Sequence, residues 1–336
     1  MRARHLFLAV IPLLALGLLA PACSTDSDRL TVYSGRTKDL ISPLLDQFSD
    51  ETGIKIDVRY GDSADLALLV DTEGDNTDVD VFISQSPGAV GFLDAQKRLA
   101  QLDEAELDLV DEQFRSGSGD WVGLSGRVRV LVYNTDLVDE AELPDSVLDL
   151  TDEQFRGRVA VAPTNGSFQD FVTAMRVELG EDVASDWLDG MAANDAKAYS
   201  NNTAIVEAVT RGEIEMGLVN HYYLARALAE DPSLPGANHF FVEGDLGSLL
   251  ISTAASIIEG TDQRDDARAL VDFLLSKAAQ EFFSQETFEY PLARGVAPSD
   301  ALPPLDSIPT TSIDLDELGG GLARTAEIIQ DSGLDG

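Results

Sequence analysis

The order of apolar strands and amphipathic helices in the first third of the chain constrains the fold most. Residues 30–33 predict a strand, and apolar residues then recur at helical spacing from Asp39 to Thr52 before Gly53 ends the helix. The same pair of patterns follows twice more, with strands at 54–60 and 79–83 and helices that open at Asp62-Ser63 and Ser86-Pro87. This β-α-β-α-β-α order is typical of a mostly parallel sheet covered by helices, so an α/β fold is predicted.

A second stretch of the chain also alternates predicted strands and helices. Between Trp121 and Tyr133 the sequence predicts two strand-like runs broken at Gly126, and residues 265–283 predict one long amphipathic helix. The other expected elements are strands at 159–161, 215–219 and 248–258, and helices at 168–179, 201–212 and from 222 onward. At 336 residues the chain is long enough for two domains. Two α/β units that the chain crosses twice, with a ligand between them, would satisfy this layout.

In open α/β sheets a ligand lies beyond the carboxyl ends of the strands, at the turn into the next helix. This rule selects four segments of the sequence: 33–37, 84–86, 165–167 and 220–223.

The first 23 residues have the pattern of a targeting segment. Arg2 and Arg4 precede an uncharged apolar run from Leu6 to Ala20, which is too short for a permanent spanning helix. The run ends in Leu19-Ala20-Pro21-Ala22-Cys23. This end resembles a bacterial lipoprotein signal, in which Cys23 is lipidated and becomes the mature N-terminus, although Ala20-Pro21-Ala22 also suits ordinary secretion. Cys23 is the only cysteine, so it has no disulfide partner in the chain, and lipidation is its simplest use.

The charge of the chain excludes some partners. Sixty acidic residues against 23 basic ones give a formal net charge of -37, which opposes binding to nucleic acid or to anionic lipid headgroups. Common catalytic signatures are also missing from the sequence, among them a nucleophile elbow, a phosphate-binding loop and a His-Glu-x-x-His motif. We therefore do not expect an enzyme.

Tyr222 and Tyr223 follow a predicted strand and open a predicted helix, where unpaired backbone N–H groups favour negative charge. A tyrosine is neutral at pH 7, but a trivalent cation can displace its proton, and the phenolate is a hard donor suited to Fe(III). A pair of tyrosines taken alone is more often a packing feature.

Six short motifs occur in order across most of the chain. They are Thr31-Val32-Tyr33-Ser34-Gly35-Arg36, Asp80-Val81-Phe82, Ser125-Gly126-Arg127-Val128-Arg129-Val130-Leu131-Val132-Tyr133-Asn134, Pro163-Thr164-Asn165-Gly166-Ser167-Phe168, Asn220-His221-Tyr222-Tyr223 and Glu289-Tyr290-Pro291-Leu292. From Leu30 to about Val296 the chain thereby resembles the ferric-iron-binding periplasmic proteins of ABC importers, which share the transferrin-like bilobal fold.

The resemblance implies a two-lobed, type II periplasmic-binding-protein-like fold with the ligand cleft between lobes joined by two crossing strands. The expected divisions are a signal peptide at 1–23, a tether at 24–29, lobe 1 at 30–126 plus 252–295, lobe 2 at 127–251, and a C-terminal segment at 296–336 packing on the lobes.

The resemblance also implies a site. Tyr222 and Tyr223 are its expected iron ligands, and Tyr133 matches a position that supplies a further phenolate in some relatives. The expected anion-binding residues are Asn165, Gly166, Ser167, Asn202 and Asn220, with Arg36 balancing the charge of the anion.

Two positions depart from the pattern of the family. Many relatives have a histidine where this chain has Thr37 and a glutamate where it has Gln85. Both are poor Fe(III) ligands, so we expect a synergistic anion such as carbonate, phosphate or citrate to complete the shell. His221 could donate to the ligands or face solvent.

The leading hypothesis is an exported, monomeric solute-binding protein, in the periplasm or anchored through Cys23 at the outer face of the cell membrane, that delivers ferric iron to an ABC transporter permease. One alternative is the same class of protein for another solute, an anion or a small organic cation. A secreted enzyme is the third reading, and no constellation of residues supports it.

Overall fold

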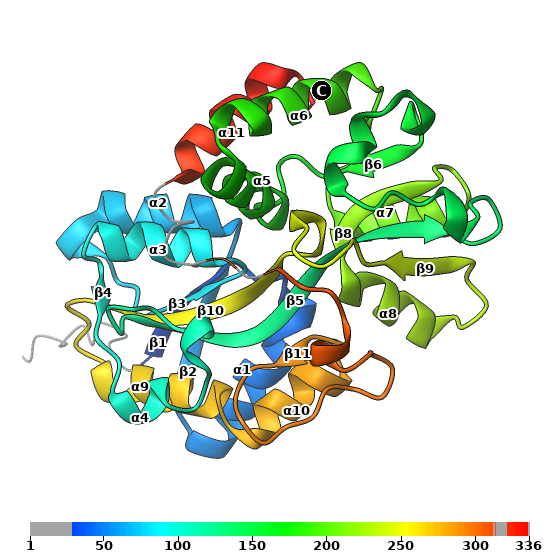
Figure 1. Cartoon of the computed structure of the whole chain (residues 1–336). Helices are drawn as coiled ribbons and strands as arrows, with labels where there is room; N and C mark the ends of the chain where they lie inside the picture. The colour runs from blue at the N-terminus through cyan, green and yellow to red at the C-terminus, as the bar shows by residue number, and fades with distance from the viewer. Residues whose placement is uncertain (1–28, 312, 314–320, 335–336) are drawn as a thin grey trace, which may run out of the picture.

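The computed structural model describes residues 29–311, 313 and 321–334 (Figure 1). The expected signal peptide, Cys23 and nearly all of the expected tether lie outside these residues. Strand β1 begins at Arg29, one residue before the predicted boundary. In the described part of the chain no helix combines the length and the apolar character needed to cross a membrane.

The N-terminal elements form the predicted parallel arrangement. Strands β1, β2 and β3 alternate with helices α1, α2 and α3, which confirms the β-α-β-α-β-α order. Their bounds are β1 Arg29–Ser34, α1 Lys38–Thr52, β2 Lys55–Tyr60, α2 Ser63–Glu73, β3 Val81–Ser84 and α3 Pro87–Ala95. The sheet continues from β3 to β10 (Leu250–Ile258) and then to β5 (Trp121–Asn134), both antiparallel to their neighbours.

Strand β5 is continuous over its 14 residues, so the predicted break at Gly126 is wrong. The glycine has a packing role instead of a turn. It lies opposite Tyr290 of β11 (Tyr290–Pro291), and a Cβ at this position would come within 3.0 Å of the Leu292 side chain. The first half of β5 pairs with β10 and its second half with β8 (Met216–Asn220), so β5 runs from one part of the sheet into the other.

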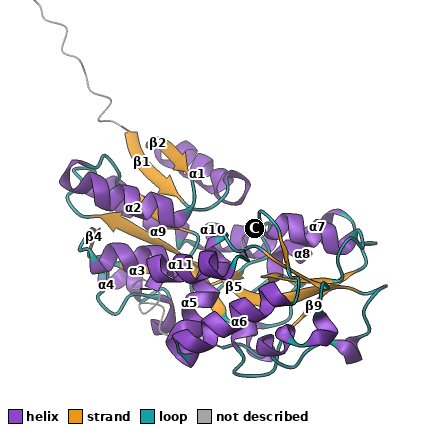
Figure 2. Ribbon diagram, turned by 90° about the horizontal axis from the view of Figure 1, so that it is seen from above, coloured by secondary structure: helices purple, strands orange, loops and turns teal. Residues whose placement is uncertain are grey.

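The second part of the sheet continues from β8 to β6 (Val159–Val161) and β7 (Lys197–Ala198), which run parallel. Strand β9 (Gly236–His239) pairs with the far half of β5. The accompanying helices are α5 Gly166–Leu179, α6 Glu181–Ala193, α7 Asn202–Thr210 and α8 His221–Glu230. In Figure 2, α1 and α2 lie in one half of the molecule and α7, α8 and β9 in the other, with β5 between them.

The region predicted as one helix over 265–283 is two helices, α9 Arg264–Leu274 and α10 Lys277–Gln285. The prediction was wrong because Ser276 caps a new helix, its hydroxyl accepting a hydrogen bond from the Ala279 N–H. Two short elements, β4 Leu99–Ala100 and α4 Glu104–Leu107, lie between α3 and β5.

Helix α11 (Leu322–Ser332) packs on α5 and α6 and also touches α3. The Thr325 and Thr173 hydroxyls lie 2.7 Å apart, and Arg176 donates to the Gly321 carbonyl at 2.9 Å. The C-terminal helix therefore contacts elements of both halves, as Figure 1 shows at the top of the molecule.

Candidate ligand-binding site

The tyrosine pair, Tyr222 and Tyr223, lies in the first turn of α8, directly after β8 ends at Asn220. The two rings stack with centroids 4.2 Å apart. Tyr222 is completely buried and Tyr223 half-buried. Burial, and then the neighbouring Tyr223, raise the pKa of Tyr222 well above its ordinary value, so its hydroxyl keeps its proton unless a strong cation displaces it.

Residues from the other half of the molecule reach the tyrosine pair. Gln85, at the end of β3, donates from Nε2 to the Tyr222 hydroxyl at 3.3 Å. Thr37, before α1, and Tyr223 both line a cavity of about 460 Å³ that also touches Asn165. At the edge of this cavity Arg226 of α8 pairs with Asp39 of α1 at 2.9 Å. Tyr223 therefore lines a cavity between α1, α7 and α8, and the Tyr222 ring that stacks on it is buried.

The turn before α5 brings three of the predicted anion-binding residues together. The Asn165 side-chain oxygen caps the helix, accepting from the Ser167 N–H at 3.1 Å and from the Ser167 hydroxyl at 2.6 Å. Asn202, at the start of α7, donates to the Ser167 hydroxyl oxygen at 3.4 Å. Gly166 is the first residue of α5, and a Cβ there would meet only the Ser86 hydroxyl at 3.9 Å. Its contribution is therefore a backbone N–H.

Asn220 is buried at the end of β8, and neither its amide oxygen nor its amide nitrogen has a hydrogen-bond partner among the described residues. It lies opposite Arg129 in the β5–β8 ladder. A buried amide without a hydrogen-bond partner costs about 1–3 kcal/mol of folding free energy, so this side chain is suited to bind a polar ligand.

Arg36 is paired within the protein, which argues against its predicted role of balancing the charge of an anion; its Nε alone has no hydrogen-bond partner among the described residues. Its guanidinium is completely buried and forms two bonds with Glu289, Nη1 to Oε1 at 2.9 Å and Nη2 to Oε2 at 2.5 Å. Nη1 also donates to the Thr253 hydroxyl at 2.7 Å. The charge of Arg36 is thus balanced by a carboxylate of the protein itself.

Two other arginines lie on β5, and one of them, Arg127, shares the Thr253 hydroxyl with Arg36. Arg127 and Arg129 are buried on the same face of β5, and together with Arg36 they form the arginine cluster. Arg129 donates to the Ser167 hydroxyl at 3.4 Å, while its Nη2 has no partner within the described ranges. Arg127 donates to Thr253 at 2.9 Å, and its Nε and Nη2 are likewise without partners there. Burial, and then Arg127, lower the pKa of Arg129 to about 9.

The sequence already indicates that these two arginines are buried on one face of a strand. They stand two positions apart in an otherwise apolar strand, so their side chains share one face, and a buried charge needs a partner.

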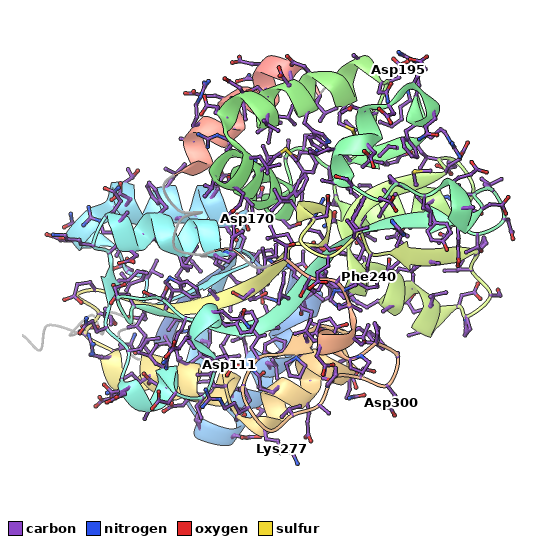
Figure 3. The ribbon with its side chains drawn as sticks, viewed as in Figure 1. Asp111, Asp170, Asp195, Phe240, Lys277 and Asp300 are labelled. Carbon is purple, nitrogen blue, oxygen red and sulfur yellow. The ribbon has the colours of Figure 1, made fainter. Side chains whose placement is uncertain are left out.

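Asp170 on α5 is the acidic neighbour of the arginine cluster. It is buried near the middle of the molecule, where Figure 3 labels it beside α5. Burial raises the pKa of Asp170 to about 7, and Arg127 and Arg129 partly oppose this shift. Its Oδ2 has no hydrogen-bond partner in the described structure.

The structure does not bring Tyr133 to the tyrosine pair. Tyr133 lies opposite Met216, the first residue of β8, whereas Tyr222 lies two residues beyond the last, Asn220. The four residue steps from Met216 to Asn220 alone span about 13 Å. The Tyr133 hydroxyl donates to Glu140 at 3.4 Å. The strand register thus places Tyr133 at the opposite end of β8 from the tyrosine pair, which argues against Tyr133 as a third ligand.

His221 does not face solvent. It is buried, its Nδ1 accepts from the Val128 N–H at 3.1 Å, and its Nε2 lies 3.0 Å from the Phe288 carbonyl oxygen. Burial lowers the pKa of His221 to about 4.

The site as a whole combines two phenol oxygens with buried, partly unpartnered donors. Across residues 29–311, 313 and 321–334, no three His, Cys, Asp or Glu side chains gather into a group that could hold a metal ion. The unpartnered guanidinium and amide groups beside the two phenol oxygens suit an anion.

The whole chain is similar to known proteins. A family model for bacterial extracellular solute-binding proteins matches residues 76–318. The Fe(3+)-binding periplasmic protein of Serratia marcescens is 29% identical to this chain, over 99% of the chain and all of the relative. The major ferric iron-binding protein of Neisseria meningitidis is 31% identical, over 86% of this chain and 89% of the relative.

Among solved structures, the crystal structure of iron-bound HitA from Pseudomonas aeruginosa is similar to the whole fold. It superposes with a TM-score of 0.87 at 31% sequence identity and covers 91% of this chain and 99% of that chain. This likeness confirms the predicted two-lobed fold class.

Proposed function

Because the chain belongs to the bacterial extracellular solute-binding protein family, we propose that it binds ferric iron outside the cytoplasm and delivers the ion to the permease of an ABC importer. It acts as a carrier and not as an enzyme. Its place is the periplasm or the outer face of the cell membrane, where Cys23 would hold it as a monomeric lipoprotein.

The observation that carries this proposal is the tyrosine pair at the start of α8, stacked at 4.2 Å and next to the arginine cluster. Fe(III) supplies the charge that makes two neighbouring phenols ionise, and phenolate oxygen is the kind of hard donor that it prefers. The positive charges of Arg127 and Arg36 favour the phenolate form of Tyr222 in the same direction.

A balance of buried charge supports a synergistic anion. Fe(III) and the arginine cluster would bring six positive charges, against two phenolates and the carboxylates of Glu289 and Asp170. The difference corresponds to a dianion, and a buried uncompensated charge is costly. Carbonate, phosphate and citrate all meet this need.

The donors for that anion are the 165–167 turn, Asn202, Asn220 and Arg129. Ser167 lies within hydrogen-bond reach of both Asn202 and Arg129, so one anion beside it could meet donors from α5, α7 and β5. Arg129 thus assumes the charge-balancing role first given to Arg36.

The test is a titration of the iron-free protein with ferric citrate. Tyrosine coordination predicts a visible phenolate-to-iron charge-transfer band that saturates at one iron per chain. The titration is repeated with ferric nitrilotriacetate in a buffer stripped of carbonate, phosphate and citrate, where the band should be weaker and return when one of these anions is added. A protein that takes up no iron under any of these conditions refutes the proposal.

The same titration addresses the second candidate, a binding protein of this family for an anionic solute. Thr37 and Gln85 provide no negative charge opposite the tyrosine pair, and the unpartnered groups of Arg127 and Arg129 would suit an anion without a metal. Calorimetric binding of phosphate or citrate by the iron-free protein, with no visible band on adding iron, would favour this candidate.

A further inference from the structure

His221 connects three separate segments of the molecule immediately beside Tyr222. The residue is only 1% exposed, and both ring nitrogens are within hydrogen-bond distance of backbone groups. One partner, Val128, belongs to the crossing strand β5, and the other, Phe288, belongs to the segment that follows α10. The ring also packs against Tyr290 with centroids 4.9 Å apart.

The two partners fix which nitrogen carries the proton. The Val128 N–H can only donate, so Nδ1 must accept. The Phe288 carbonyl can only accept, so Nε2 must donate. His221 is therefore a neutral ring in the Nε2–H tautomer, and its two bonds have opposite directions.

The bond to Val128 completes a strand ladder. The pairing of β5 with β8 ends where Arg129 lies opposite Asn220, and Val128 is the next residue along β5. The Arg129 N–H points the other way and donates to Leu249 at 2.9 Å. The Val128 N–H thus faces the side where β8 has already ended, and the His221 ring supplies the acceptor that a strand residue would have given.

The bond to Phe288 leads to the buried ion pair. Phe288 has φ of 56°, a left-handed conformation that is unfavourable for a residue with a side chain, and it presents its carbonyl to His221. The next residue, Glu289, binds Arg36. Arg36 and Arg127 share the Thr253 hydroxyl of β10. One chain of bonds therefore runs from the residue preceding Tyr222 to both strands that cross between the halves of the molecule.

We propose that His221 is a positioning residue that fastens the tyrosine-bearing start of α8 to the junction of the two halves, so that Tyr222 and the junction move as one unit. This role rests on the proposed iron site. A helix start held at two points keeps the Tyr222 oxygen in a fixed place relative to the donors that come from the other half, and a ligand displaced by about 1 Å binds poorly.

Two substitutions separate the two bonds of His221. In His221→Asn the amide oxygen can occupy the place of Nδ1 and keep the bond to Val128, but the side chain is too short to reach Phe288. In His221→Gln the amide nitrogen can approach the place of Nε2 and keep the bond to Phe288, while the bond to Val128 is lost. His239→Asn is the matched control, because His239 also bonds a backbone carbonyl, that of Pro144 at 2.8 Å, away from the tyrosine pair.

The measurement is the rate at which an excess of a competing chelator removes iron, followed by loss of the visible phenolate band. Loss of one buried hydrogen bond predicts release about tenfold faster in each His221 variant, with a shifted band, and release close to the wild-type rate in His239→Asn. Wild-type rates and an unshifted band in both His221 variants overturn the positioning role. A wild-type protein without a band refutes the iron site itself, and the positioning role falls with it.

A measurement on the unaltered protein covers the case in which the variants do not fold. With diamagnetic Ga(III) in place of iron, nuclear magnetic resonance should show slower hydrogen exchange at the Val128 amide and at His221 Nε2 on loading. Unchanged exchange at both positions in the Ga(III)-loaded protein contradicts the proposal.

Discussion

Arg36 and Glu289 form a doubly bonded ion pair in which both side chains are completely buried, although 253 positions separate them in the sequence. The pair ties the turn after β1 to the segment after α10. We therefore expect Arg36 to stabilise the fold beside the site, and we propose that Arg129 rather than Arg36 meets the ligand.

Arg36→Met should lower the free energy of unfolding by about 3–5 kcal/mol, because it leaves the Glu289 carboxylate buried without a partner. The double variant Arg36→Met/Glu289→Met should recover a large part of this loss, since it removes both buried charges. Urea unfolding, monitored by circular dichroism, measures the free energy of unfolding of both variants. Equal stability of wild type and the single variant would show that the ion pair contributes nothing.

The Arg36–Glu289 pair also predicts how the free energy of unfolding depends on pH. Burial acts to raise the pKa of Glu289, but Arg36 outweighs it and holds the pKa below its ordinary value. A carboxyl group with a lower pKa in the folded than in the unfolded state stabilises the fold at pH values above its unfolded pKa, which is about 4.3 for glutamate. This stabilisation is lost as the pH falls through the folded pKa. The Met/Met variant should therefore lose less stability on acidification below about pH 4 than the wild type does.

Arg129→Gln should weaken the dependence of iron binding on the added anion, because the guanidinium beside Ser167 supplies charge to that anion. A charge-assisted hydrogen bond contributes about 1.5–3 kcal/mol, so the anion concentration for half-maximal effect should rise at least about tenfold. Arg158→Gln is the control, because Arg158 forms surface ion pairs with Glu142 and Glu215.

An identical anion dependence in Arg129→Gln and wild type would exclude Arg129 from the site.

Gln85→Glu should make iron binding tighter and less dependent on the anion. The Gln85 side chain already lies 3.3 Å from the Tyr222 oxygen, so a carboxylate in its place would add an anionic donor from the opposite half of the molecule. Gln85→Ala, which removes the side chain, should keep the full anion dependence. Competition against a calibrated chelator, with and without carbonate, distinguishes these outcomes. The prediction fails if Gln85→Glu needs the anion as much as the wild type.

Cys23→Ser should release the protein from the membrane without changing iron binding. Cys23 follows the apolar run of the targeting segment and is the only cysteine of the chain. Partition of whole-cell extracts into a detergent phase measures the anchor. If the unaltered protein is already in the aqueous phase, ordinary secretion is the correct interpretation of the signal.

Local pattern was enough to predict the repeating α/β units and the place of the tyrosine pair. Apolar alternation gave β1 to β3 and their helices, and the strand-to-helix turn at Asn220 placed Tyr222 and Tyr223 in the first turn of α8. These features depend on neighbours within a few positions, which the sequence displays directly.

The sequence does not reveal partners that are distant along the chain. Nothing near Arg36 indicates that Glu289 will neutralise it, and nothing near Tyr133 indicates that its register partner is Met216 at the far end of β8. The same holds for Gly126, whose lack of a side chain serves the approach of Tyr290 and Leu292. Such pairings are set by tertiary packing, so the periodicity of a single segment does not contain them.

The central claim is that Tyr222 and Tyr223 bind ferric iron, and the most direct measurement is the visible absorption of the iron-loaded protein in Tyr222→Phe, Tyr223→Phe and the control Tyr133→Phe. Phenylalanine keeps the packing of each ring and removes only its oxygen. We expect each of the first two variants to bind iron at least about a hundredfold more weakly with a diminished band, since a charged ligand is lost, while Tyr133→Phe behaves as wild type. Unchanged affinity and absorption in both Tyr222→Phe and Tyr223→Phe would contradict the account.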